Sequence, residues 1–380
     1  MLDGLTHEQQ MLQESTRRFV DEEMLPHEDL VDRDGHVPIE LGRQIESRAK
    51  EIGLFAANLP ENVGGGGLDY TCMAVIEREF GRTSHALHAW VARPTELLLA
   101  TEGAQKEQYL APCVTGAKRE LFALSEPEAG SDIMSMKSNA KRDGDDWILN
   151  GSKHFISGPV MPDFAIVFAA TGCDETPRGS RTRITAFLVD VGMPGFDIQV
   201  GYNCVSYRGY LNFKLDFDNV RLGPDHILGE EGRGLELSGK WLGMGRIWVG
   251  ATCCGKAERL FEMAKSWAAE RKQFGQAIGK FQATGFKLAD MAVELRAADL
   301  LVKDAINKAD QGVMTDSDAA MVKLYCSEML NRVADNTVQI YGGMGLMDDL
   351  PVQRLWRDSR LERILDGTSE IQRHIITRNL

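Results

Sequence analysis

The residues with the clearest chemical potential lie near the C-terminus, in the segment Asp366-Gly-Thr-Ser-Glu-Ile-Gln372. A carboxylate can remove a proton from carbon when burial raises its pKa towards the working pH. The same segment also fits a helix start, because aspartate is a favoured N-cap and Ser369 and Gln372 have the spacing of a capping box. The pattern alone therefore leaves Asp366 as either a base or a helix cap.

Groups that could contact a diphosphate occur at two other points. Arg271 can donate charge-assisted hydrogen bonds, and the glycines of Gly342-Gly-Met-Gly345 permit close backbone approach. Plainer explanations are a charged helix end beside Glu270 and a helix stop. The glycine run Pro60-Glu-Asn-Val-Gly-Gly-Gly-Gly-Leu68 lacks the Gly-Lys-Ser/Thr of a phosphate loop, so it predicts a turn.

The composition is that of an ordered globular protein with an acidic surface. Of 380 residues, 43% are hydrophobic and 26% are charged, and the formal net charge is −13. Because nucleic acid and anionic membranes bind through cationic surfaces, neither is expected as a partner. The length predicts two or three packed units that can bury a large cofactor.

The cysteines and the N-terminus limit the chemistry and the location. Seven scattered cysteines without a Cys-x-x-Cys pair favour reduced core thiols over disulfides, and no metal site is expected. The N-terminus has no basic stretch followed by an apolar run, and no segment approaches the roughly 18 apolar residues of a membrane span. We therefore expect a cytoplasmic protein, or one that reaches a matrix-like compartment after processing, with no membrane span.

The elements that must position these residues follow from hydrophobic periodicity. Helical spacing extends from Thr6 to about Ala117, period-two alternation marks residues 121 to 228, as in Leu211 to Phe217, and helical spacing returns after Gly229. The turn at 141–146 predicts a hairpin. We expect three domains, over residues 1–118, 119–228 and 229–380.

Three blocks resemble the acyl-CoA dehydrogenase family, in the family's order and over nearly the whole chain. The first is Leu124-Ser-Glu-Pro-Glu-Ala-Gly-Ser-Asp132, followed by Leu149-Asn-Gly-Ser-Lys-His-Phe-Ile-Ser157. The second is Arg271-Lys-Gln-Phe-Gly-Gln-Ala-Ile-Gly-Lys-Phe-Gln282. The third runs from Gln339-Ile-Tyr-Gly-Gly-Met-Gly345 through Arg357-Asp to the Asp366 segment.

The resemblance implies an α+β fold with an N-terminal helical domain, a central β-barrel-like domain and a C-terminal four-helix bundle. It implies an FAD enzyme that desaturates an acyl-CoA thioester, with the α-proton going to Asp366, the β-hydride to N5 of FAD, and electrons to an electron-transfer flavoprotein. An enoyl-CoA reductase working in reverse and a catalytically silent CoA- or partner-binding homologue remain alternatives. An acyl-CoA oxidase is disfavoured by the short chain.

The resemblance also implies contacts for the flavin ring. Flat apolar and hydroxyl-bearing side chains on two strand-like segments would supply them: Phe122, Leu124, Ser125, Phe155 and Ser157. The pattern alone favours ordinary β-core residues, and the match to the family's positions reverses that preference. Gly130 and Ser131 match positions that meet the flavin and the CoA pantetheine. Glu128 departs from the family's usual Gly or Asn, which puts the local CoA contacts in question.

Further FAD contacts are implied to cross between subunits. In the family, the positions of Arg271, Phe274 and Gln282 contact the FAD of a neighbouring chain, and those of Gln339, Gly342 and Gly343 approach its diphosphate and adenine. The Asp366 segment adds Thr368 and Glu370. The resemblance therefore implies a homotetramer built as a dimer of dimers.

The base itself departs from the family, which commonly has glutamate where this chain has Asp366. Losing one methylene withdraws the carboxylate by about 1.5 Å. The flanking Leu365 and Gly367 would contact the thioester, whose oxygen the family polarises with the backbone N–H of the base and a ribityl hydroxyl. Some relatives carry the base on an earlier helix, where this chain has Gly245. The next residue, Arg246, is either a support for CoA or the base, or a packing arginine.

The acyl group is implied to lie near Ser84-His-Ala-Leu-His-Ala-Trp-Val-Ala-Arg-Pro-Thr-Glu96, which is polar for an alkyl pocket. His88 and Arg93, with Trp90 and Glu96, could recognise a short, cyclic or carboxylated acyl group. A solvated turn with an arginine–glutamate pair explains the same residues. Because relatives with an aspartate base act on alicyclic esters, a ring substrate is a further expectation.

Overall fold

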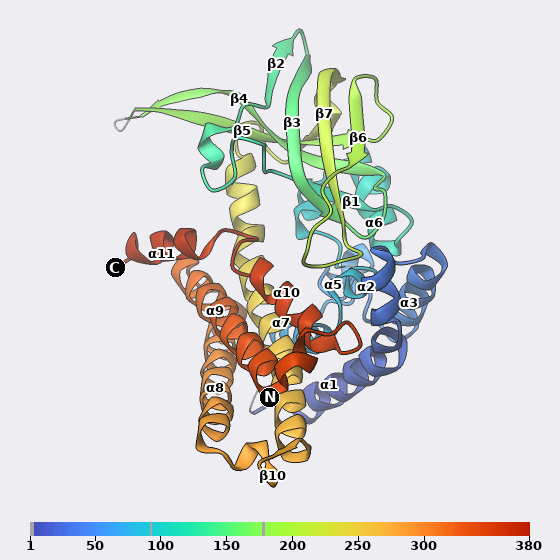
Figure 1. Ribbon diagram of the computed structural model, residues 1–380. Coiled ribbons are helices and arrows are strands. Elements are labelled where there is room, and N and C mark those ends of the chain that lie inside the picture. The colour runs from blue at the N-terminus through green and yellow to red at the C-terminus, as the bar shows by residue number, and fades with distance from the viewer. Residues whose placement is uncertain (1–3, 92, 177–178) are drawn as a thin grey trace.

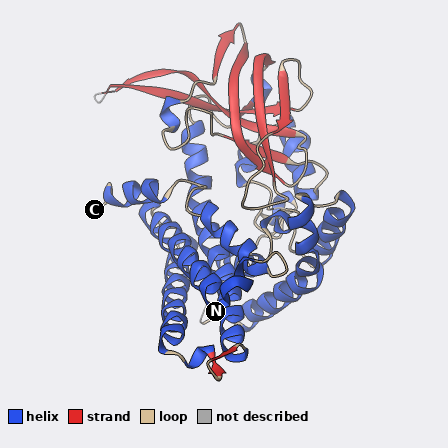
Figure 2. Ribbon diagram, in the orientation of Figure 1, coloured by secondary structure: helices blue, strands red, loops and turns tan. Residues whose placement is uncertain are grey.

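The computed structural model describes residues 4–91, 93–176 and 179–380, and along the chain its helical segments precede and follow a central sheet (Figure 1). Figure 2 shows the sheet stacked on the helices, with one long helix running from the sheet to the opposite end of the molecule. The N-terminal helices are α1 His7–Phe19, α2 Glu28–Asp34, α3 Ile39–Glu51, α4 Tyr70–Phe80, α5 His85–His88 and α6 Ala111–Thr115.

Local sequence explains where these helices begin. Thr6 and Gln9 form a reciprocal capping box at α1, and the Asp69 carboxylate accepts a hydrogen bond from the Cys72 N–H at α4. The glycine run at 60–68 is a packed turn, as predicted: a Cβ on Gly65 would lie 2.1 Å from the carbonyl oxygen of Leu59.

The central sheet is curled and has eight strands in the order β6-β7-β3-β2-β4-β5-β8, with β1 pairing parallel to β4. The strands are β1 Glu120–Ala123, β2 Asn139–Asp143, β3 Asp146–Gly158, β4 Phe164–Thr176, β5 Gly179–Asp190, β6 Phe196–Val200, β7 Leu211–Leu222 and β8 Ile227–Leu228. Phe213, Leu215 and Phe217 are buried at alternate positions of β7, and residues 143–146 form the predicted hairpin.

The register of β3 against β7 shifts twice, and the second shift lies between Lys153 and Ile156. Phe155 falls within it, adopts a φ of 54° and is 59% exposed. A bulge redirects side chains and bends the strand. It therefore turns an aromatic ring out of the sheet.

The C-terminal helices are α7 Gly234–Glu270, α8 Gln282–Asp310, α9 Asp316–Tyr341, α10 Pro351–Leu361 and α11 Ser369–Thr377. A small hairpin, β9 Lys272–Gln273 with β10 Gln276–Ala277, joins α7 to α8. At 1.5 Å per residue α7 is about 55 Å long. It starts against β5 and ends at this hairpin, at the end of the molecule opposite the sheet (Figure 1).

A buried ion network fastens the N-terminal helices to the C-terminal ones. Arg78 on α4 is 1% exposed, and its Nε lies 3.0 Å from Asp299 Oδ1 on α8. Its Nη1 lies 3.0 Å from Glu258 Oε2 on α7. Because every charge in this network has a partner, the interface can exclude water without leaving an ion unpaired.

The helix-to-strand changes support a three-part division. The helix α6 ends at Thr115 and β1 begins at Glu120, while β8 ends at Leu228 and α7 begins at Gly234. We propose domains over residues 1–118, 119–228 and 229–380. Within the described part of the chain, none of the helices combines the length and apolar character that a bilayer crossing requires.

Candidate active site

Asp366 is half-buried in the tight loop that joins α10 to α11. Its φ is 50° and that of Gly367 is 93°, so the chain reverses through two left-handed residues. Aspartate accepts this conformation more readily than most residues. The loop is held through its carbonyls: the Gln372 side-chain amide donates to the oxygens of Asp366 at 3.1 Å and Gly367 at 2.8 Å.

The structure overturns the alternative that Asp366 caps a helix. The N-cap of α11 is Thr368, whose Oγ1 accepts from the Ile371 N–H at 3.3 Å. The expected capping box between Ser369 and Gln372 is also absent from this described segment. The Ser369 hydroxyl instead donates to Glu328 Oε1 at 2.8 Å. The Asp366 carboxylate is therefore not used as the cap of α11.

The Asp366 carboxylate faces α7 where that helix has no side chain. A Cβ on Gly245 would lie 3.8 Å from Asp366 Oδ2. The next residue, Arg246, is 9% exposed, and its Nε is buried with no hydrogen-bond partner among the described residues. Gly245 and Arg246 thus bring open space and an unsatisfied donor to the same place.

Competing effects set the protonation of Asp366. Burial raises the pKa of its carboxyl above the ordinary value, while the cations of Lys323, Arg246 and Arg93 oppose that rise and the Glu362 carboxylate adds to it. The nearby Arg246 shows the reverse: burial lowers its pKa. A carboxyl whose pKa is raised but still partly countered has the properties that a general base needs.

An arginine–glutamate pair lies beside α7, one helical turn beyond Gly245. Trp248 follows Gly245 by three residues and shares its face of the helix. The Arg93 guanidinium lies 5.5 Å from the Trp248 ring centroid and pairs through Nη1 with Glu77 Oε1 at 2.7 Å. The other Glu77 oxygen is buried without a hydrogen bond in the described structure, and His88 Nε2 is 3.5 Å from it.

This geometry corrects two details of the acyl-site expectation. The arginine–glutamate pair is formed by Arg93 and Glu77, and Glu96 is not part of it. Glu77 was not singled out from the sequence. Trp90 belongs to the core: it is 3% exposed and packs against Gly42, where a Cβ would lie 2.1 Å from its ring.

Aromatic side chains that sequence reasoning missed surround this group. The His85 ring stacks on Tyr207 at 4.3 Å and meets Tyr210 edge-on at 4.7 Å. Burial lowers the pKa of His85 and raises that of Tyr210, which the Asp366 charge raises further. Tyr207 and Tyr210 lie outside every motif, and only their position next to β7 could have drawn attention.

A buried lysine was missed as well. Lys323 on α9 is 0% exposed, and its ammonium donates to the carbonyl oxygen of Gly367 at 2.8 Å. The sequence feature that could have identified Lys323 is a single charge within the otherwise apolar run Ala319-Ala-Met-Val-Lys-Leu324.

The predicted flavin-ring residues lie on β1, in the segment that follows β1, and on β3. Phe122 contacts Trp241 of α7 at a ring-centroid distance of 4.3 Å, and the Ser157 carbonyl accepts from the Tyr210 hydroxyl at 3.3 Å. Leu124 is buried, whereas Phe155 is exposed and Ser125 half-buried. Gly130 and Ser131 are exposed nearby, and a Cβ on Gly130 would meet nothing within 4 Å.

The other predicted FAD residues lie at the opposite end of α7. Arg271 ends that helix, Phe274 in the following hairpin is 95% exposed, and Gln282 starts α8. Exposed Gln339, Gly342 and Gly343 are at the same end, because Tyr341 between them stacks on Trp267 of α7 at 4.6 Å. From Gly245 to Arg271 the helix axis extends about 39 Å.

The residues at the sheet end fit the FAD that the resemblance implies. An exposed ring at a β-bulge, half-buried serines and an open glycine position are the flat and polar contacts that an isoalloxazine needs. Thr368 and Glu370 lie beside the base loop, at the start of α11. No metal-binding cluster of His, Cys, Asp or Glu occurs among the described residues.

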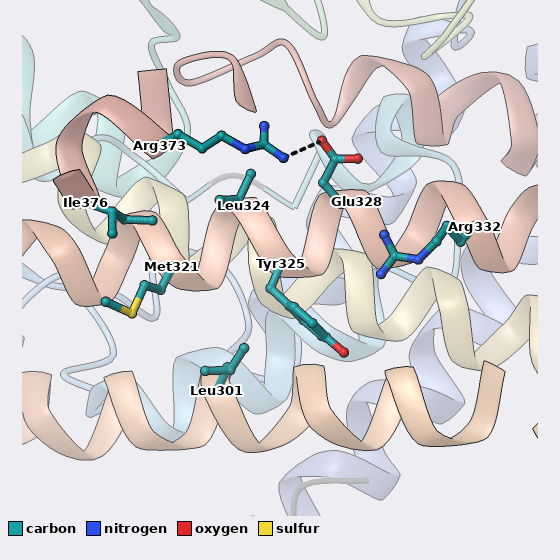
Figure 3. A pocket seen from close by; sticks show the side chains of 8 residues that line it. All are labelled: Leu301, Met321, Leu324, Tyr325, Glu328, Arg332, Arg373 and Ile376. Atoms are coloured by element: carbon teal, nitrogen blue, oxygen red, sulfur yellow. Dashed lines mark ion pairs between the residues drawn. The ribbon is translucent and has the colours of Figure 1, made fainter. Parts of the chain in front are cut away.

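A cavity of about 500 Å³ lies away from these groups, between α8, α9 and α11. Figure 3 shows its apolar lining of Leu301, Met321 and Ile376, with an ion pair between Arg373 and Glu328 at its rim. It contains neither Asp366 nor the strand residues, so it is distinct from the candidate site.

Comparison with known families gives one consistent result. The chain matches the family models for the acyl-CoA dehydrogenase N-terminal domain over residues 6–117, the middle domain over 121–220 and the C-terminal domain over 232–380.

Individual relatives cover nearly the whole chain. It is 35% identical to a 3-(aryl)acrylate reductase of Clostridium sporogenes, with 99% of each chain covered. It is 34% identical to the caffeyl-CoA reductase-Etf complex subunit CarC of Acetobacterium woodii, with 98% of each covered. It is 35% identical to the human mitochondrial short-chain specific acyl-CoA dehydrogenase, over 98% of this chain and 89% of the relative.

Solved structures agree with this result. Butyryl-CoA dehydrogenase from Megasphaera elsdenii superposes with a TM-score of 0.89 at 32% identity, covering 100% of this chain and 99% of that one. An acyl-CoA dehydrogenase complexed with FAD, from Bacillus anthracis, gives 0.89 at 27% identity and covers 99% of this chain and 67% of that one.

Proposed function

Because the chain belongs to the acyl-CoA dehydrogenase family of FAD-dependent oxidoreductases, we propose that it desaturates an acyl-CoA thioester between Cα and Cβ, with Asp366 as the base. One observation carries the proposal. The Asp366 carboxylate lies against Gly245, 3.8 Å from where a Cβ would be, and burial raises its pKa. It is therefore an acid group placed at open space, with its pKa shifted towards the value that a base needs.

In this mechanism the chain's own residues bind, orient and move one proton. The thioester lies with its α-carbon at Asp366, whose carboxylate takes the α-proton. Leu365 and Gly367 flank the thioester, and Arg246 offers its unsatisfied Nε to CoA or to the base. Bound FAD would supply the acceptor for the hydride of the β-carbon, so that the two electrons could leave the substrate as the double bond forms.

The cofactor would be held from both ends of the fold. Phe122, Leu124, Ser125, Phe155, Ser157, Gly130 and Ser131 would contact the ring and its surroundings, with Thr368 and Glu370 from α11. Arg271, Phe274, Gln282, Gln339, Gly342 and Gly343 would serve the diphosphate and adenine of a neighbouring subunit's FAD. This arrangement is supported by the 39 Å or so that separate Arg271 from Gly245 along α7.

The proposed electron partner is an electron-transfer flavoprotein. A relative of similar length is a subunit of a reductase–Etf complex. Two relatives named as reductases favour a second candidate function, the same chemistry in reverse. In that direction Asp366 would give the α-proton to the substrate.

The proposed acyl group is short, cyclic or carboxylated. Trp248 lies one turn of α7 from Gly245, Arg93 lies over its ring, and Glu77, which pairs with Arg93, has an unsatisfied oxygen. Arg93 has further donors besides the one on Glu77, and a buried polar group gains from a polar ligand. Such a lining is unfavourable for a long alkyl chain.

The test is anaerobic reduction of the purified yellow holoenzyme by a panel of esters. Butyryl-CoA, glutaryl-CoA, cyclohexanecarboxyl-CoA, 3-phenylpropionyl-CoA and palmitoyl-CoA would be compared by bleaching of the flavin. We expect bleaching by one of the first four and little by palmitoyl-CoA. Oxidation of the dithionite-reduced enzyme by the matching enoyl-CoA measures the reverse direction. Failure of every ester in both directions would leave the silent homologue as the better explanation.

A further inference from the structure

We propose that Lys323 is a positioning residue for the base: its ammonium holds the Gly367 carbonyl and thereby fixes the Asp366 carboxylate and favours its ionised form. This inference rests on the proposed function, because it assigns Lys323 a role through Asp366. Lys323 lies on α9, is far from Asp366 in sequence, and falls in none of the three motif blocks of this chain.

The first argument is burial. The Lys323 side chain is 0% exposed, and its only hydrogen bond found within the described structure is to the Gly367 oxygen at 2.8 Å. Burying an ammonium with one neutral acceptor is costly, so a lysine is a poor choice if the only need is to anchor a carbonyl. The charge itself has a use at this position.

The second argument is the geometry of the loop. Asp366 and Gly367 are both left-handed, and their carbonyls accept bonds from Gln372 and Lys323. The two donors approach the Gly367 oxygen from different helices, α11 and α9. Their joint hold fixes the backbone that carries the base carboxylate, and a displacement of 1 Å at a reacting group can lower a rate a hundredfold.

The third argument is the charge balance around the base. The charged groups that act on Asp366 are Lys323 from α9, Arg246 from α7, Glu362 from the end of α10, and Arg93 from the loop after α5. The Tyr210 hydroxyl also interacts with the Asp366 charge. Burial raises the pKa of Asp366, and of these groups Lys323 opposes the rise most strongly. Burial also lowers the pKa of Lys323, and the Asp366 carboxylate opposes that change more strongly than any other group. The two groups therefore stabilise each other's charge.

The experiment separates charge from anchoring by comparing the two donors. Lys323→Met removes a positive charge and one anchor of the Gly367 carbonyl. Gln372→Met removes the other anchor of that carbonyl and no charge. The rate of anaerobic flavin reduction is measured against pH for flavin-saturated holoenzyme, with the ester that reduces the parent. Lys323→Met should lower the rate at neutral pH roughly tenfold to a hundredfold. It should also move the rising limb of the rate–pH profile to higher pH, because without the Lys323 charge burial raises the pKa of Asp366 further.

Gln372→Met should lower the rate and leave the position of the limb unchanged. The matched control is Lys287→Met, since Lys287 also bonds α9, through Asn336 Oδ1 at 2.9 Å, and lies outside the described site. Its rate and profile should match the parent's. If Lys323→Met fails to retain flavin, Lys323→Gln keeps a donor at neutral charge and should show the same shift. An unshifted limb in both Lys323 variants would overturn the inference.

A second readout needs no turnover. In a double-mutant cycle of thermal midpoints at pH 7, Lys323→Met should lower the midpoint less in the Asp366→Asn background than in the parent, because the lost attraction is already absent. Additive effects would overturn the inference. The flavin assay of Asp366→Asn separates this inference from the proposed function. If Asp366→Asn bleaches at the parental rate, Asp366 is not the base. If Asp366→Asn is inactive but the pH profile of Lys323→Met is not shifted, only the role of Lys323 is refuted.

Discussion

At the scale of single residues, the aspartate at position 366 is compatible with its backbone as well as with its chemistry. The φ of 50° at Asp366 is a conformation that Asp and Asn adopt far more often than Glu does. A shorter acid thus suits a loop reversed through two left-handed residues. The loop, and not the side-chain length alone, determines how far the carboxylate reaches.

Substitution of Asp366 tests the base directly. Asp366→Asn keeps size and backbone preference but cannot accept a proton, so substrate-dependent bleaching should fall at least about a hundredfold with flavin content unchanged. Asp366→Glu should retain activity and change the preference between acyl groups. Anaerobic stopped-flow bleaching measures both. Parental bleaching by Asp366→Asn would move the base elsewhere, with Glu96 the next acid to test.

The same variant has a stability signature with a defined sign. The pKa of Asp366 is raised in the fold, so its contribution is fully present below the unfolded value and is lost as pH rises through the folded pKa. Asp366→Asn should therefore melt at or slightly above the parent's midpoint at pH 7. Thermal melts at pH 7 check this, and a clearly lower midpoint would indicate a structural role for the carboxylate.

Sequence reasoning at this scale succeeded where a residue lies in a motif and failed where tertiary contacts decide. Asp366, Gly245 and Arg246 were singled out, and the structure brings all three together. Glu77 and Lys323 were missed, because each is an ordinary charged residue on a helix until packing buries it. The suggested cap failed for a local reason: Thr368 occupies the N-cap, two residues later than the sequence indicated.

At the scale of elements, periodicity predicted the helical and strand regions because each element buries one face. It could not predict the bulge at Phe155, since a register shift leaves the alternation on either side intact. Nor could it predict that α4 would be fixed to α7 and α8 by charge. All eight residues of α4 from Met73 to Phe80 are buried, so the charged Glu77, Arg78 and Glu79 are as buried as their apolar neighbours and the hydrophobic pattern does not reveal their burial.

This buried network should govern acid stability. Burial opposes ionisation of Glu258, but Arg78 and Arg17 outweigh it and hold the pKa of that carboxyl at about 2. The stabilisation is therefore present above the unfolded value of 4.5 and is lost as pH falls towards 2. Glu258→Gln should destabilise the protein by about 3 kcal/mol at pH 7. The difference from the parent should shrink between pH 4.5 and 2 in urea unfolding, and a pH-independent difference would contradict the assignment.

At the scale of the whole molecule, one chain does not bring its predicted FAD contacts together. The ring contacts lie near the sheet and Arg271 lies about 39 Å away along α7. A single rigid helix separates the two groups, so no small loop motion could join them. We therefore propose a homotetramer, as a dimer of dimers, in which a neighbouring chain supplies Arg271 to each flavin.

Removing Arg271 tests this sharing. Arg271→Ala deletes an exposed cation from the end of α7, so folding should be nearly unchanged. Loss of one charge-assisted contact should weaken FAD binding by about 1.5 to 3 kcal/mol. The flavin-to-protein ratio after dilution and gel filtration measures the loss. Arg221→Ala on β7 is the control, because Arg221 is an exposed arginine that pairs with Asp143 and Asp146 of the neighbouring hairpin. An unaltered ratio in Arg271→Ala would remove this arginine from the cofactor site.

The exposed face of α8 indicates where the chains would meet. Phe286, Val293 and Leu300 are 63%, 69% and 49% exposed and follow one another at intervals of seven residues. That interval is the repeat of helices that pack along a shared seam. A large apolar stripe left in water is unfavourable for a monomer. We infer that a second copy covers it.

A charge in the middle of that stripe should break the assembly and release the flavin with it. Val293→Lys would bury an unpaired ammonium at the seam, so the proposed tetramer should dissociate, whereas Val200→Lys, at a 58% exposed position on the edge strand β6, should not change the mass. Light scattering coupled to gel filtration measures the mass, and absorbance at the flavin band measures FAD in the same peak. Because each flavin would depend on Arg271 of a neighbour, dissociation and flavin loss should occur together. A parent protein that is monomeric with full FAD occupancy, or a Val293→Lys variant that dissociates and keeps its flavin, would show that one chain holds the cofactor alone.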